Sequence, residues 1–151
     1  MLQMVKNRLK DQKGLTLIEL LAVIVILGIV SAIAVPSILG IIENSKVDAI
    51  KSEAIQVINA GKMYVASEGV PTTTSNGTTT SGGDISGAQI EPYLEDTQLT
   101  GITLHVTADN VISISATGNT GKNTITFTKA ALTDIQGSGK PENGTLTITG
   151  P

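Results

Sequence analysis

Positions 20–42 hold 23 consecutive residues without a single charge, and this run limits the possible folds of the 151-residue chain more than any other segment. A helix needs about 20 residues to cross a hydrocarbon core of about 30 Å, so the run is long enough for a membrane span. The small residues Ser31, Ala32 and Ala34 are similar to a signal-peptidase site. A secretory signal, however, has a shorter apolar region that ends at such a site. The run therefore predicts a retained transmembrane helix.

The charges on the two sides of this run have opposite signs. Residues 1–14 carry a net charge of +3, from Asp11 against four basic residues, Lys6, Arg8, Lys10 and Lys13. The rest of the chain carries six Lys and twelve Asp or Glu, a net charge of −6. Basic residues directly before an apolar span favour a cytoplasmic N-terminus. The acidic remainder argues against a nucleic-acid partner, because backbone binding depends on Lys and Arg.

Residue types that carry catalysis or bind metals are scarce. The chain has 1 Phe, 2 Tyr, no Trp, no Cys and a single His, which excludes disulfides, thiolate nucleophiles and Cys-based metal sites. His105 falls on the polar phase of a predicted strand, so we expect a surface side chain. The carboxylates of Asp84, Glu91, Glu95 and Asp96 suit calcium, but their spacing matches no calcium loop, and surface charge is the preferred interpretation. No Ser/His/Asp, Cys/His or metal constellation is visible, so we expect no enzyme, no metal and no cofactor.

Three residues are unusual for a simple membrane anchor: Glu19 at the start of the apolar run, and Gly28 and Pro36 within it. Alone, they are compatible with an interfacial carboxylate and a kinked helix. Directly upstream, however, residues 13–19 read KGLTLIE, and a long apolar run follows. This segment resembles the N-terminal signature of type IV pilins and the related pseudopilins.

The resemblance implies a processing event and an assembly residue. A prepilin peptidase would cut between Gly14 and Leu15 and methylate the new Leu15 terminus, with Lys13 as the usual basic residue before the Gly. Glu19 becomes the fifth mature residue, whose partner in the family is the N-terminal amine of a neighbouring subunit. Two departures stand out: many members have Phe as first mature residue, and this chain lacks the C-terminal Cys pair with which many pilins staple their last loop.

In fibres of this family, part of the N-terminal helix loses helical order around a Gly and a Pro. These two residues match Gly28 and Pro36, so the resemblance implies the same loss of order here. From residue 43 the pattern becomes amphipathic, and apolar residues recur at spacings of three and four: Val47, Ile50, Ala54, Val57, Ile58, Gly61, Tyr64 and Val65. We therefore divide the chain into a leader (1–14), a transmembrane and fibre-core helix (15–42), an amphipathic helix (43–66) and a Thr/Gly-rich β head (67–151).

The head is expected to be mostly β. Residues 68–84 have no periodic apolar face and predict a mobile surface loop, whose Asn76 begins a glycosylation sequon, as does Asn143. Residues 90–94 predict a short turn or helix. Alternating apolar residues then predict four strands, at residues 102–106, 112–116, 125–127 and 146–148. The expected fold is α+β, the pilin fold: a long N-terminal helix packed on a small antiparallel sheet of about four strands.

The functional expectation is a structural subunit of an extracellular type IV pilus. It would be a single-pass inner-membrane precursor that becomes part of a homopolymer on the cell surface. The alternative is a pseudopilin of a type II secretion or competence system. The resemblance implies a prepilin peptidase, an assembly platform and its ATPase as further partners. A DNA-uptake receptor is disfavoured by the acidic head, and a membrane-anchored enzyme by the missing catalytic residues.

Overall fold

The computed structural model describes the backbone of residues 2–151 and the side chains of residues 17–151. The side chains of the leader residues Lys6, Arg8, Lys10 and Lys13, and of Gly14 and Leu15, lie outside the described residues. The chain divides into two compact units, Met1–Ile42 and Glu43–Pro151, and each is described by itself.

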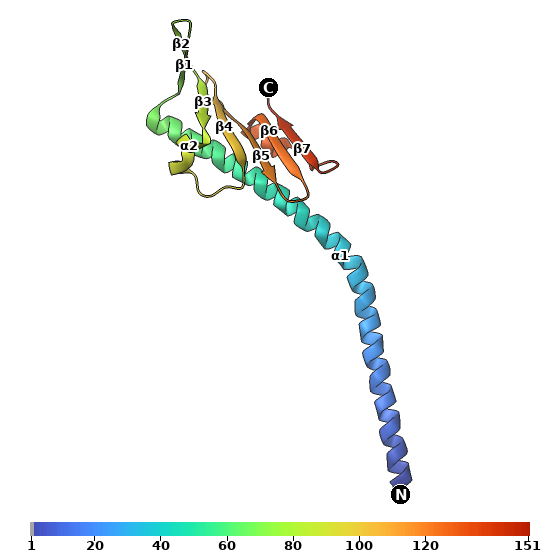
Figure 1. The fold of residues 1–151 in the computed structure, drawn as a ribbon. Helices are drawn as coiled ribbons and strands as arrows, with labels where there is room; N and C mark the ends of the chain where they lie inside the picture. The colour runs from blue at the N-terminus through green and yellow to red at the C-terminus, as the bar shows by residue number, and fades with distance from the viewer. Residues whose placement is uncertain (1) are drawn as a thin grey trace. The chain divides into compact units, whose positions relative to one another are not determined.

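Helix α1 spans Leu2–Glu68 and contains Pro36 (Figure 1). Between Leu17 and Glu68 it is long and apolar enough to cross a membrane, by length and composition. The helix continues through Gly28 and Pro36 in this single chain. The predicted loss of helical order there concerns assembled fibres and stays a prediction.

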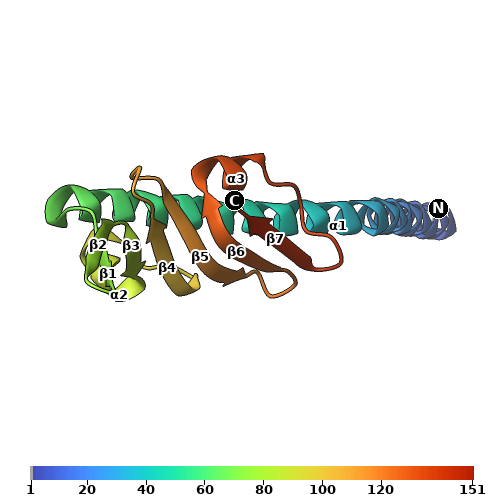
Figure 2. The same cartoon turned by 90° about the horizontal axis from the view of Figure 1, so that it is seen from above.

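The second unit packs the C-terminal part of α1 against a five-stranded sheet (Figures 1 and 2). The sheet contains the four predicted strands and one more. Its order is β3 (Gly83–Ser86), β4 (Thr100–Val106), β5 (Ile112–Asn119), β6 (Thr124–Ala131) and β7 (Thr145–Thr149). The α+β fold with a long N-terminal helix on a sheet is thereby confirmed.

One strand direction was predicted wrongly. β3 to β6 pair antiparallel, but β7 runs parallel to β6. Between these two strands the chain forms helix α3 (Leu132–Gly137), which the sequence pattern did not indicate. A connection that contains a helix can bring the chain back to the end of the sheet where β6 begins, so that the next strand runs parallel to β6. A tight hairpin instead reverses the direction of the next strand. The alternation of apolar residues indicates only which face of a strand is buried. It is therefore the same whether the strand runs parallel or antiparallel to its neighbour.

The expected loop at residues 68–84 contains a β-hairpin and the beginning of β3, which corrects the prediction of a loop without strands. β1 (Thr72–Ser75) pairs with β2 (Thr78–Ser81) through a turn at Asn76 and Gly77, whose φ values are 50° and 76°. Two positive φ values at Asn-Gly define the tight turn that suits the twist of a two-residue hairpin. All eight strand residues are exposed, which explains why no apolar alternation marks them.

The short helix predicted at residues 90–94 is confirmed as two consecutive elements, α2 (Gly87–Ile90) and the 3-10 helix η1 (Glu91–Tyr93). The predicted apolar face of α1 is confirmed as well. Its buried members are Val47, Ile50, Ala54, Val57, Ile58, Gly61 and Val65, joined by Ala60, while Tyr64 is half-buried. They meet the inward residues of β4, β5 and β6, with Phe127 as the largest buried side chain.

Two glycines allow α1 to lie close to the sheet. A Cβ built at Gly61 would collide with Leu104 Cδ1, and a Cβ at Gly118 on β5 would collide with Ile50 Cγ2. Because interiors are packed to the density of organic crystals, added volume at such positions has nowhere to go. Gly61 and Gly118 therefore set the distance between helix and sheet.

Candidate assembly interface

Residues 17–42 of α1 present a long apolar surface in which Glu19 is the single charged side chain. Every large aliphatic side chain between Leu17 and Ile42 is 44% to 73% exposed in the single chain. Burying apolar area stabilises by about 25 cal/mol per Å², so this surface favours either a lipid environment or the equivalent helices of other subunits. A helix that is apolar all round is suited to a membrane or to the centre of a bundle.

Glu19 is placed by α1 within this apolar surface, among exposed aliphatic side chains that include Ile18 and Leu20. A carboxylate in the middle of a membrane helix costs about 2.5–3.5 kcal/mol on insertion scales. A positive partner would offset that cost, and Glu19 forms no hydrogen bond or ion pair with the side chains of residues 17–151. The carboxylate is therefore suited to pairing with a charged group of another molecule.

The glycines of the apolar segment are not required by packing within the chain. A Cβ at Gly28 or at Gly40 would meet no atom within 4 Å. This distinguishes them from Gly61 and Gly118, where the chain itself fills the space. Small residues in membrane helices allow backbones of neighbouring helices to approach, so Gly28 and Gly40 suit contacts between subunits.

Charged side chains of α1 hold three loops of the head. Glu43 Oε2 accepts hydrogen bonds from Thr120 and Asn123 at 3.3 and 3.5 Å. Lys51 Nζ donates to the carbonyls of Ser138 and Gly139 at 3.1 and 2.7 Å. Glu53 Oε2 accepts from the Thr97 hydroxyl and the Gln98 amide at 3.0 and 2.8 Å. The helix thus organises the loops as well as the core, through polar side chains whose partners lie far away in the sequence.

The structure brings together a Ser/His/Asp group that was not visible in the sequence. His105 Nδ1 lies 2.7 Å from Asp84 Oδ1, and His105 Nε2 lies 2.9 Å from Ser115 Oγ. The Ser115 oxygen also accepts the backbone N–H of Lys129 at 3.1 Å. Strand pairing creates this proximity between residues far apart in the chain, so no local motif could reveal it.

This group differs in its surroundings from a hydrolytic triad. Its side chains lie on the open outer face of the sheet, and the Asp84 side chain is 65% exposed. Catalytic dyads depend on a site that excludes water and supplies donors to the developing oxyanion. The hydrogen bonds link β3, β4, β5 and β6 across that face, which is a stabilising role. His105 is thus a polar-phase residue, as expected, but with two hydrogen-bond partners.

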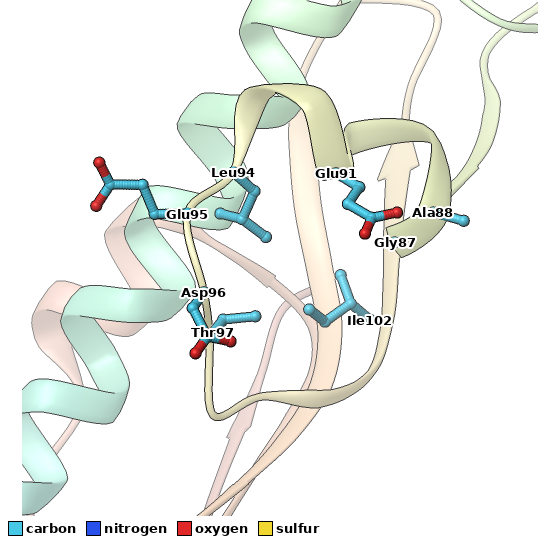
Figure 3. A pocket seen from close by; sticks show the side chains of 8 residues that line it. All are labelled: Gly87, Ala88, Glu91, Leu94, Glu95, Asp96, Thr97 and Ile102. Atoms are coloured by element: carbon cyan, nitrogen blue, oxygen red, sulfur yellow. The ribbon is translucent and has the colours of Figure 1, made fainter.

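The carboxylates considered for calcium do not form one ligand set. Glu91, Glu95 and Asp96 line a surface pocket near η1, and Figure 3 shows the Glu95 side chain pointing away from the other two. Asp84 is engaged with His105. Within residues 17–151 no group of three or more His, Cys, Asp or Glu side chains is arranged to hold a metal ion. These four carboxylates therefore do not converge on one position.

Comparison with known proteins found one family model and one curated relative that are similar to this chain. Residues 9–35 match the family model of the prokaryotic N-terminal methylation motif. Over 71 residues the chain is 34% identical to the type II secretion system core protein G of Vibrio cholerae, an alignment that covers 47% of this chain and 49% of that protein. The chain thus spans about half the length of this curated relative. No solved structure matches. The two matches confirm the predicted likeness to pilins and pseudopilins.

Proposed function

We propose that the chain is the structural subunit of an extracellular type IV pilus. It is inserted in the inner membrane with its N-terminus in the cytoplasm, cleaved between Gly14 and Leu15, methylated at Leu15 and polymerised through its N-terminal helix. The leader then comprises residues 1–14, the fibre-core helix 15–42, the amphipathic helix 43–66 and the head 67–151. The observation that carries the proposal is the exposed apolar surface of α1 at residues 17–42, which contains Glu19 and overlaps the match to the methylation motif at residues 9–35.

Processing and assembly are physically connected in this proposal. Cleavage after Gly14 removes a leader of net charge +3 and creates an ammonium group on Leu15, four residues from Glu19. The carboxylate of one subunit then meets the ammonium of its neighbour, and the pair fixes the register of helices whose aliphatic surfaces alone would allow sliding. The uncut leader would instead bring four basic side chains into the apolar bundle.

Two features of the described residues support a structural role rather than a catalytic one. These are the apolar surface of α1 and the head rich in Thr and Ser, and neither of them supplies a water-excluding site for a reaction. The expected partners are other copies of the chain, the prepilin peptidase, and an assembly platform with its ATPase.

The second candidate function is a pseudopilin of a type II secretion or competence system. It is favoured by one observation, the similarity to the core protein G of Vibrio cholerae. Both candidates share processing and polymerisation, and they differ in the length and location of the filament. A pilus extends beyond the cell surface, whereas a pseudopilus is short and remains within the envelope.

The deciding experiment combines mass spectrometry and microscopy. Protein sheared from intact cells at native expression is analysed for its N-terminus, and the same cells are imaged with antibody against the head. We expect a methylated Leu15 terminus and labelled filaments extending from the surface. A processed Leu15 terminus without surface filaments would favour the pseudopilin. A Met1 terminus confined to the membrane would contradict both candidates.

A further inference from the structure

The free edge of β7 differs from a protected sheet edge. β7 pairs with β6 on one side only, and it is the last strand of the sheet. Its residues Thr145–Thr149 include no charge and no proline. Natural sheets protect their edges with Lys, Pro, bulges or very short strands, because an open edge accepts further strands. An edge strand without charge or proline leaves its outward backbone groups open to pairing with a further strand.

Backbone hydrogen bonds show which groups of β7 point outward. Thr124 N–H donates to the Gly144 carbonyl and Gly150 N–H donates to the Thr128 carbonyl, so the even-numbered residues of this segment face β6. The odd-numbered residues face away. Thr145 is satisfied by Glu142, with which it exchanges two hydrogen bonds of 3.0 and 3.1 Å. Within the described part of the chain, the outward N–H and C=O groups of Thr147 and Thr149 have no backbone partner.

A groove runs along these two residues. It has a volume of about 410 Å³ and is open to solvent, with Leu146, Thr147, Ile148 and Thr149 on one side. Residues of α3 and the segment after it, Thr133, Asp134, Gly137, Ser138 and Gly139, form the other side. An extended backbone that enters the groove would find N–H and C=O groups on β7 to pair with, as in β-strand addition.

A hairpin whose strands are also uncharged lies beside β3, the opposite edge strand of the sheet. The hairpin β1–β2 adjoins β3 through the bridge between Thr72 and Gly82, and Figures 1 and 2 both place it on the side opposite β7. All of its strand residues are exposed Thr or Ser, and none carries a charge. Thr is favoured in exposed strands, and Thr–Thr pairs across strands form stabilising contacts.

We infer that the β1–β2 hairpin of one copy docks on the free edge of β7 of the next copy. The hairpin forms a separate two-stranded sheet beside β3, and β7 is the opposite edge of the five-stranded sheet, so the hairpin of a chain does not pair with β7 of the same chain. Such a contact is heterologous, and it repeats without closing when the rotation does not form a ring. The inference rests on the proposed filament and adds head-to-head contacts to those of the N-terminal helix.

Cross-linking in filaments tests the contact directly. The chain contains no Cys, so introduced thiols are unique. Filaments carrying Thr79→Cys and Thr147→Cys are treated with a short bis-maleimide, whose reach tolerates small differences in strand register. We expect a ladder of covalent multimers. The matched control pairs Thr79→Cys with Ser52→Cys, an exposed position on α1, and we expect no ladder from it.

A second pair of variants tests the edge itself. In Thr147→Pro the outward N–H is lost, and proline is tolerated at an edge position whose N–H faces solvent. We expect unchanged processing and an unchanged melting temperature of the full chain, but a loss of sheared filaments. The control Thr147→Val keeps the N–H and should assemble normally.

The outcomes separate this inference from the proposed function. Filaments that form but show no Thr79–Thr147 ladder would overturn the docking contact and leave the filament subunit intact. Normal filaments from Thr147→Pro would overturn it in the same way. A wild-type chain that forms no filaments under the microscope would overturn the proposed function, and the docking contact with it.

Discussion

At the scale of single residues, Glu19 is the strongest candidate for a specific contact in an otherwise featureless apolar surface. Aliphatic packing is non-directional, so it stabilises many alignments of two helices almost equally. A single buried polar or ionic group is a known means of fixing register between helices. Glu19 is well suited to this role because the exposed side chains that follow it on α1 are aliphatic over several turns.

Replacing Glu19 by Ala should leave cleavage and methylation intact and abolish or strongly reduce filament assembly. The reason is the lost partner for the Leu15 ammonium of the neighbouring subunit. N-terminal mass spectrometry and counting of sheared filaments measure the two effects separately. Glu19→Asp keeps the charge and serves as the control that should retain partial assembly. Normal filaments from Glu19→Ala would contradict the register role.

His105 allows a second test at this scale, on stability. His105→Leu removes the hydrogen bonds to Asp84 and Ser115, and two such bonds contribute about 1–2 kcal/mol to the free energy of unfolding. Urea unfolding of the full chain in detergent measures the difference. Ser113→Ala is the matched control, because Ser113 pairs with His105 in register but takes no part in these bonds. Equal stability of both variants would show that the group contributes little.

At the scale of elements, the contact between α1 and the sheet determines whether the head is correctly packed. Gly61→Val would place side-chain atoms where Leu104 now lies, and overpacking of this kind costs about 1–3 kcal/mol. We expect a lower unfolding midpoint of the head. Gly40→Ala is the matched control, since its Cβ meets no atom within 4 Å. An unchanged midpoint for Gly61→Val would mean that Leu104 and its neighbours repack around the added atoms without cost, and that Gly61 does not set the distance between helix and sheet.

Elements whose residues repeat with a clear period could be predicted from the sequence. The helix face from Val47 to Val65 and the four alternating strands follow from burial on one side, which leaves a pattern in the order of residues. The hairpin β1–β2 left no such pattern because neither of its faces is buried. The direction of β7 depended on the path of the chain through α3, and that path is a property of the tertiary fold.

The candidate site also contains local features, which the sequence predicts, and contacts between distant segments, which it does not. The motif around Gly14, Leu15 and Glu19 is local, so sequence alone predicts it, and the N-terminal match supports the resemblance. The loop contacts of Lys51 and Glu53 and the Asp84–His105–Ser115 group connect distant segments. Such contacts depend on which strands become neighbours, and composition does not encode that.

At the scale of the whole molecule, the division between Ile42 and Glu43 separates the apolar part of α1 from a compact unit that contains the amphipathic part of α1 and the head. A fragment of residues 43–151 keeps every residue of the buried core, from Val47 to Ile148. We expect this fragment to fold, to remain monomeric in sedimentation experiments and to form no filaments, because it lacks the apolar surface and Glu19. The processed full chain is the comparison. Filaments of the fragment alone would contradict assembly through the N-terminal helix.

The C-terminal part of the head is held by apolar packing of Ile135 and Ile148 and by hydrogen bonds, without a disulfide. Lys51 holds the carbonyls of Ser138 and Gly139, and Gly150 N–H is bonded to Thr128, in a chain without Cys. The head therefore matures without an oxidase or a disulfide isomerase. A filament built from it keeps its subunits folded in anaerobic or thiol-rich surroundings, where proteins stapled by labile disulfides would loosen.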